Sequence, residues 1–196
     1  MIPLKPFYMI RHGESIANLD GYYSGQMDVP LTETGIKQAE QAALIVGRLE
    51  QKPHIIFHSH LSRARDTAGI INKHLGVEMI ENKDISEHDV GDWQGTPNDS
   101  VTQSMREGVD PPNGESHKDF HARVARGIGA ALGHDEQSIP LIVCHGGVFR
   151  GFAANFGFDL HRIQNCIVHE FIPAPGQNIP WKIISYQEDG ANEIAL

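Results

Sequence analysis

Cysteine, positive charge and long apolar runs are all scarce in this sequence. Its 196 residues include two cysteines, and no apolar run reaches the roughly 18 residues that a membrane-spanning helix needs. Lys and Arg together number 16 against 25 Asp and Glu, which gives a formal net charge of −9. Proteins that bind nucleic acids carry basic patches. The charge therefore argues against a nucleic-acid partner, and the lack of a long apolar run argues against a membrane protein.

The two cysteines also bear on the cellular compartment. Cys144 lies in the apolar stretch Ile139–Cys144, where we expect a buried thiol rather than one half of a disulfide. The first residues, Met1 to Leu4, do not show the pattern of a secretory signal peptide. Both observations predict a reducing, cytoplasmic location.

The rest of the composition is that of an ordinary globular protein, with 40% hydrophobic and 21% charged residues. The chain shows no internal repeat, low-complexity tract or linker, and its length suits one core. We therefore expect residues 1–196 to form a single domain. The sequence leaves the oligomeric state open, a homodimer being one option.

Short apolar runs alternate with helical patterns along the chain. Their order, β–α–β–α–β–α–β–β, predicts a three-layer α/β/α sandwich around a mixed, mostly parallel sheet. Residues 16–31 are predicted as a loop, and residues 96–113 as a connector with one helical turn at Val101–Met105. The expected strands are Phe7–Ile10, Ile55–Phe57, Val77–Ile80, Ile139–Cys144, Cys166–Ile172 and Trp181–Tyr186. Three long helices are expected between them. They are Ile36–Leu49 capped by Thr32, a helix from an N-cap at Ser62 to a stop at Gly76, and Phe120–Gly133 capped by Ser116.

The first predicted strand ends in Arg11-His12-Gly13. In an open α/β sheet, ligands bind just beyond the carboxyl ends of the strands. Arg11 offers a planar, permanent cation that matches a phosphate, and His12 has a ring nitrogen that can attack phosphorus. Gly13 lets the backbone approach a ligand closely. This strand end is therefore a candidate phosphate site.

Two further strands end in comparable groups. Arg63 falls in the first turn of the helix that follows Ile55–Phe57, and His145-Gly146-Gly147 follows the strand Ile139–Cys144. The carboxyl ends of parallel strands lie along one edge of a sheet. We therefore expect the three groups to converge there.

The chain contains 12 histidines, so a zinc site is an alternative to consider. His58 and His60 are two residues apart on a predicted strand, and His117 and His121 are four apart on a predicted helix. Such pairs do bind metals. No Cys or carboxylate lies at ligand spacing beside His58 and His60, so we predict no metal site.

Five blocks of residues occur in the order seen in one known family. The chain resembles the histidine phosphatase superfamily, which contains the cofactor-dependent phosphoglycerate mutases and their phosphatase relatives. The blocks cover about residues 7 to 150 and are Arg11-His12-Gly13-Glu14, Arg63-Ala64-Arg65-Asp66-Thr67-Ala68, Glu87 with Gly91-Asp92-Trp93-Gln94-Gly95, Gly114-Glu115-Ser116 and His145-Gly146-Gly147.

This resemblance implies a role for each matched residue. His12 would be the phosphorylated nucleophile, and Glu87 would be the proton donor. No metal and no cofactor is implied. The residues expected to bind the phosphoryl group or the substrate are Arg11, Asn18, Ser24, Gly25, Arg63, His145 and Gly146.

The implied chemistry fits these residue types. Guanidinium groups and a histidine stabilise the negative charge that spreads over the oxygens of a transferring phosphoryl group. The same cations keep His12 neutral, as a nucleophile must be. Glu87 lies near Val90 and Trp93, so we expect a partly apolar setting that favours its protonated form.

The resemblance leaves a choice between phosphatase and mutase. Mutases of this family carry a longer insertion between the Trp93 and Gly114 regions, with extra basic residues for a substrate that has two anionic groups. Here that interval contains only Arg106 as a base, and His88 follows Glu87 where mutases have arginine. We therefore expect a phosphatase that acts on a small phosphomonoester, with a 2,3-bisphosphoglycerate-dependent phosphoglycerate mutase as the alternative.

Two functions of other classes are less favoured. A serine hydrolase needs a G-x-S-x-G elbow, and neither Gly13-Glu14-Ser15-Ile16-Ala17 nor Gly114-Glu115-Ser116-His117-Lys118 completes one. A non-catalytic phosphate-binding or scaffold protein would not need every expected catalytic position, and all of them are present.

Overall fold

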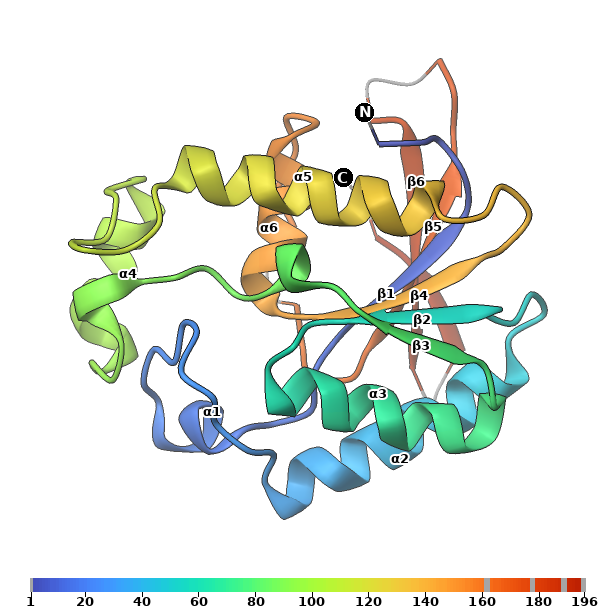
Figure 1. Cartoon of the computed structure of the whole chain (residues 1–196), viewed down its shortest axis with the longest axis horizontal. Coiled ribbons are helices and arrows are strands. Elements are labelled where there is room, and N and C mark those ends of the chain that lie inside the picture. Colours follow the sequence, from blue (N-terminus) through green and yellow to red (C-terminus); the bar gives the residue numbers. More distant parts are fainter. Residues whose placement is uncertain (1, 161–162, 177–178, 188–189, 195–196) are drawn as a thin grey trace.

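A seven-stranded mixed sheet forms the middle layer of the computed structural model, which describes residues 2–160, 163–176, 179–187 and 190–194 (Figure 1). The strand order is β3-β2-β4-β1-β5-β6-β7. The pairs from β3 to β1 are parallel, and those from β1 to β7 are antiparallel. The strands are β1 (Phe7–Arg11), β2 (Ile55–His58), β3 (Glu78–Glu81), β4 (Pro140–Cys144), β5 (Val168–Pro173), β6 (Trp181–Gln187) and β7 (Gly190–Glu193).

Helices cover both faces of the sheet (Figure 1). Helices α2 (Glu33–Arg48) and α3 (Ser62–Leu75) lie on one face, and α5 (His117–Gly133) and α6 (Gly146–Ala154) lie on the other. The predicted three-layer α/β/α sandwich is confirmed. None of the described helices is long and apolar enough to cross a membrane.

The central strand β1 is buried on both faces. Tyr8 and Ile10 pack into the core under α2 and α3, while Phe7 and Met9 pack into the core under α5 and α6. This division follows from the two-residue repeat of a strand, which points successive side chains to opposite faces. An unbroken apolar run of this kind is typical of a strand in the middle of a parallel sheet.

Two shorter helices, α1 (Ile16–Asp20) and α4 (Asn98–Arg106), lie beyond the carboxyl ends of β1, β2 and β4 (Figure 1). The first corrects the predicted loop 16–31. Ser15 caps α1 and forms a capping box with Asn18, which satisfies free amide groups at the helix start. The second extends the single turn predicted at Val101–Met105 to nine residues.

The start of α3 also differs from the prediction. Leu61, not Ser62, occupies the N-cap position, and the Ser62 amide donates to Asp28 Oδ1 at 2.7 Å. The predicted stop at Gly76 is confirmed, with the glycine in the left-handed conformation (φ 65°). Strand β7 was not predicted, because Gly190–Glu193 lacks an apolar run.

The start of α2 is pressed against the turn that follows β1. A Cβ atom on Gly35 would overlap the backbone carbonyl of Glu14, and one on Gly13 would overlap the carbonyl of Gly35. Thr32 caps α2 and also binds the same turn, since its amide donates to the Glu14 carbonyl at 2.9 Å. Two facing glycines therefore allow the helix to contact the residues beside His12 directly.

Alanine at Gly35 tests this close approach. Because the added methyl group has no space, we expect Gly35→Ala to lower the free energy of unfolding by about 1–3 kcal/mol. Gly47 lies on the same helix, and a Cβ atom there would have no neighbour within 4 Å, so Gly47→Ala is expected to raise stability by about 0.5–1 kcal/mol. Calorimetric melting temperatures that move in the same direction for both variants would contradict the close contact.

Candidate active site

Three neighbouring parallel strands bring the predicted residues to one edge of the sheet. His12 directly follows β1, Arg63 lies in the first turn of α3 after β2, and His145 connects β4 to α6. Strand β4 lies between β1 and β2 and pairs in parallel with both. The rings of His12 and His145 have centroids 5.1 Å apart. The predicted convergence of the three strand ends is therefore confirmed.

The His12 imidazole is buried and held through one of its nitrogens. Its Nδ1 lies 2.6 Å from the carbonyl oxygen of Gly13, so the neutral ring donates its proton there and keeps a lone pair on Nε2. Burial, followed by the charges of Arg63 and Arg11, lowers the pKa of His12 well below its usual value. The His12 ring is therefore neutral with the lone pair on Nε2, and its role as a nucleophile stays a prediction.

Arg63 is almost fully buried beneath the loop 21–28. Its terminal nitrogens donate to the carbonyl oxygens of Met27 and Gly25, each at 2.8 Å. Its Nε is buried with no hydrogen-bond partner among the described residues. A buried donor without a partner is costly, so an arginine held this way is suited to an anionic ligand.

Arg11, at the end of β1, has a similar arrangement. One terminal nitrogen donates to the Ile163 carbonyl at 2.8 Å, and Nε is buried without a partner in the described chain. Gly146, at the start of α6, lies beside this guanidinium, since a Cβ atom there would be 3.7 Å from Arg11 Nε. Gly146 therefore lies against Arg11, and the charges of Arg11 and Arg63 both act on His12.

His145 is fully buried, and neither of its ring nitrogens has a hydrogen-bond partner among the described residues. Burial lowers its pKa well below the usual value, and the charge of Arg63 adds to this effect. Two unpaired polar atoms in one buried ring would be costly in a core residue without a ligand. Their position beside His12 gives the site a neutral donor or acceptor for a bound anion.

Glu87 reaches the site from the segment after β3. Its Oε1 accepts a hydrogen bond from the His88 amide at 2.9 Å, and its Oε2 accepts one from the Gly147 amide at 3.2 Å. A Cβ atom on Gly147 would overlap Oε1, so the carboxyl group in this position lies directly against the glycine. Each carboxyl oxygen therefore has a backbone amide donor, and the expected partly apolar setting stays a prediction.

The segment that carries Glu87 is fixed by Arg123. This arginine donates to the carbonyl oxygens of Asp84, Ser86 and Glu87 at 3.0 to 3.1 Å. Both Glu115 oxygens bind the guanidinium in return, at 2.8 and 2.7 Å. The Gly114-Glu115-Ser116 block thus holds the segment of Glu87 in place.

Asn18 and the loop 21–28 complete the rim of the site. Asn18 Oδ1 accepts from the Ser15 amide and from Asn165 Nδ2, each at 3.2 Å, which leaves the amide NH₂ of Asn18 free to act as a donor. Gly25 binds Arg63 through its carbonyl, and Ser24 lies next to it in the same loop.

Two residues that support His12 were not predicted. Thr67 accepts a hydrogen bond from the Gly13 amide at 3.1 Å, and Asn165 donates to the His12 carbonyl at 2.7 Å. Thr67 lies one helical turn after Arg63, so helix periodicity offered a signal for it. Asn165 is 153 positions from His12, and no local pattern marks it.

The histidines considered for zinc have other surroundings. His58 Nδ1 lies 3.0 Å from the Ser59 carbonyl, and His60 Nδ1 lies 2.8 Å from Ser86 Oγ. His117 pairs with Asp110 at 3.0 Å and lies near His121, with ring centroids 6.3 Å apart. Within the described ranges, no group of three or more His, Cys, Asp or Glu side chains gathers in a way that could hold a metal ion.

The arrangement gathers two arginines and two neutral histidines at one edge of the sheet, on a phosphoglycerate mutase-like fold. The family model of the histidine phosphatase superfamily (branch 1) matches residues 7–191. The chain therefore belongs to this superfamily.

Several relatives are similar over nearly the whole chain. The probable phosphoglycerate mutase GpmB of Yersinia pestis (strain Pestoides F) is 30% identical over 204 residues, which cover 96% of this chain and 93% of the relative. The native mycobacterial glucosyl-3-phosphoglycerate phosphatase is 27% identical with a TM-score of 0.73, covering 91% of this chain and 96% of that one. Bacillus stearothermophilus YhfR is 25% identical with a TM-score of 0.74, and the match covers 88% of this chain and 93% of that one.

Proposed function

We propose that the protein is a metal-independent phosphatase that hydrolyses a small phosphomonoester through a phosphohistidine on His12. The observation that carries the proposal is the neutral His12 ring within the electrostatic influence of Arg11 and Arg63, two guanidinium groups that keep unpaired buried nitrogens. The likeness to a solved phosphatase at 27% identity supports the same assignment. The proposed location, from the two buried free thiols, is the cytoplasm.

In the first step, His12 Nε2 attacks phosphorus and the bond from phosphorus to the alcohol oxygen breaks. Arg11, Arg63 and His145 bind the phosphoryl oxygens, whose negative charge they stabilise through the transition state. Asn18 donates a further hydrogen bond from its NH₂ group. Glu87 gives a proton to the departing alkoxide, so the product leaves as an alcohol.

In the second step, water replaces the alcohol. The Glu87 carboxylate takes a proton from this water as it attacks phosphorus, and the bond from phosphorus to Nε2 breaks. Inorganic phosphate is released and His12 returns to its neutral form. The side-chain cations do the work that a metal would do elsewhere, and no step requires one.

The distribution of positive charge favours hydrolysis over isomerisation. A mutase holds a substrate with two anionic ends, and each end needs its own charge-assisted partners. Beyond Arg11 and Arg63, the candidates are Arg106 at the end of α4 and Arg150 on α6, and both side chains are exposed. This supports a pocket for one phosphate and a less charged remainder.

A mutase is the second candidate, and two observations favour it. A relative at 30% identity is described as a probable phosphoglycerate mutase. Arg150 also lies near the clamp formed by Arg11 and Arg63, because its charge contributes to lowering the pKa of Arg11. A non-catalytic phosphate-binding protein is less favoured, since a neutral nucleophile would serve no purpose in simple binding.

Trapping the phosphoenzyme tests the nucleophile. We expect brief incubation with labelled substrate in the presence of a chelator to yield a phosphohistidine that is labile in acid and stable in base. The variant His12→Ala is expected to lose both label and turnover. Label retained by that variant, or turnover that chelation abolishes and a divalent metal restores, would contradict the mechanism.

The proton donor can be tested through the leaving group. We expect Glu87→Gln to slow turnover of an alkyl phosphate at least tenfold more than that of p-nitrophenyl phosphate, whose leaving group needs little protonation. Asp89→Asn and Asp92→Asn are matched controls in the same segment, for which the ratio of the two rates stays near the wild-type value. Equal losses on both substrates for Glu87→Gln would assign Glu87 a different role.

Product analysis separates the two candidate functions. With 3-phosphoglycerate and catalytic 2,3-bisphosphoglycerate, we expect release of inorganic phosphate and little 2-phosphoglycerate, because water reaches the phosphohistidine. Both products are quantified over time in one reaction. Rapid interconversion with little phosphate release would establish the mutase instead.

A further inference from the structure

Two peptide groups next to the nucleophile are held at both of their polar ends. The carbonyl of the His12–Gly13 peptide accepts from Asn165, and its amide donates to Thr67. The carbonyl of the Gly13–Glu14 peptide faces His12 Nδ1, and its amide donates to Gln38 Oε1 at 2.8 Å. The last of these contacts connects the nucleophile to a residue on α2.

Peptide planarity gives this contact its significance. The Gly13 carbonyl and the Glu14 amide belong to one rigid planar unit. By accepting from the Glu14 amide, Gln38 sets the plane of the whole unit, and therefore the direction of the carbonyl that binds Nδ1. The line of hydrogen bonds runs from the His12 ring, through one peptide, to the Gln38 side chain.

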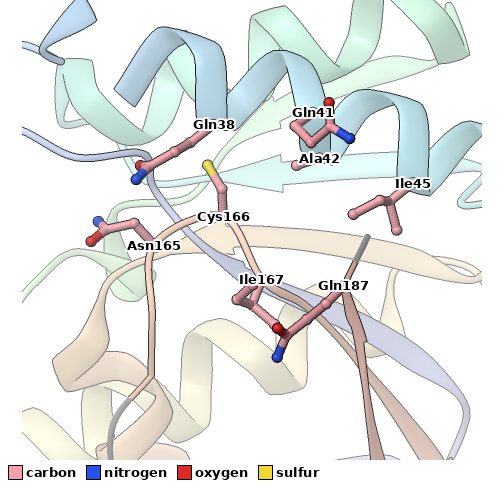
Figure 2. Close-up of a pocket in the computed structure, with 8 residues that line it drawn as sticks. All are labelled: Gln38, Gln41, Ala42, Ile45, Asn165, Cys166, Ile167 and Gln187. Carbon is pink, nitrogen blue, oxygen red and sulfur yellow. The ribbon is translucent and has the colours of Figure 1, made fainter. Parts of the chain in front are cut away.

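Helix α2 places Gln38 against the backbone that follows His12. Gly35 already packs directly against the Gly13–Glu14 backbone, and Gln38 follows it by three residues on the same face of the helix. Figure 2 shows Gln38 and Asn165 at one end of a cavity of about 430 Å³, while Gln41 lies further along the helix, between Gln38 and Ile45. Gln41 makes no hydrogen bond to the peptides around His12 in the described chain.

We propose that Gln38 is a positioning residue for phosphoryl transfer, which keeps His12 in the tautomer that has its lone pair on Nε2. The inference rests on the proposed function for its kinetic consequence, and on geometry alone for its effect on the imidazole. Without an acceptor at position 38, the peptide loses the hydrogen bond that fixes its amide, and the Gly13 carbonyl is less well aligned with Nδ1. The other tautomer then gains population, and its protonated Nε2 cannot attack phosphorus.

Three substitutions separate this role from simple packing. Gln38→Met keeps the side-chain length but removes the acceptor, whereas Gln38→Glu keeps an acceptor oxygen. Gln41 lies further along the same helix and lines the same cavity, so Gln41→Met is the matched control. With p-nitrophenyl phosphate, we expect kcat to fall about fivefold to tenfold for Gln38→Met, with KM within about twofold of wild type. Gln38→Glu and Gln41→Met are expected to retain kcat within about twofold.

The tautomer itself is read from ¹⁵N chemical shifts of the His12 ring, which His12→Ala assigns. We expect Nδ1 to carry the proton in the wild type, in Gln38→Glu and in Gln41→Met, and the signal of protonated Nε2 to rise in Gln38→Met. An unchanged tautomer in Gln38→Met, or equal kcat losses for Gln38→Met and Gln41→Met, would overturn the proposal. If the wild type has no phosphatase activity, the proposed function fails, and the tautomer measurement still decides the role of Gln38.

Discussion

Burial of two arginines beside neutral imidazoles is the constraint on which this site depends. Removing a guanidinium from water is expensive unless other groups replace its hydration. Backbone carbonyls do part of this work, from Gly25 and Met27 for Arg63 and from Ile163 for Arg11. The Nε atoms of both arginines stay buried without a partner among the described residues, and under the proposed function a phosphoryl group would supply one.

This constraint also explains why so much of the surrounding structure is glycine. Gly147 makes room for the Glu87 carboxyl, and the pair Gly13 and Gly35 lets α2 meet the turn after β1. In each place a methyl group would overlap a polar oxygen. Close packing of backbone against reactive groups keeps them at fixed positions, which is what electrostatic stabilisation of a transition state requires.

The fold and the strand-end residues could be predicted because their signals are local. Unbroken apolar runs mark the buried strands, and polar residues at the ends of β1, β2 and β4 share one edge by the rule for parallel sheets. Thr32 and Gly76 mark helix ends through the chemistry of their own side chains and backbone. Short elements such as α1 and β7 escaped prediction because turn-forming composition also suits a single helical turn or an edge strand.

The support around the site could not be predicted, because it depends on contacts between distant parts of the chain. Arg123 holds the backbone around Glu87 from 36 to 39 residues away, and Asn165 reaches His12 across 153. The amide contacts of Glu87 escaped prediction for the same reason. Its apolar neighbours Val90 and Trp93 are adjacent in sequence, whereas the amide of Gly147 that binds its carboxyl is 60 residues away.

Residues 163–166, just before β5, hold groups of the site that are made much earlier in the chain. Ile163 binds the Arg11 side chain, Asn165 binds the His12 carbonyl, and the Cys166 amide donates to the Arg11 carbonyl at 2.9 Å. The ribosome makes this segment more than 150 residues after His12, which takes about 8 to 30 seconds at about 5–20 residues per second. Until then His12 and Arg11 lack these partners, so a nascent or truncated chain would have the strand end without the contacts that hold it. Under the proposed function, phosphate binding would then report that synthesis has passed this segment.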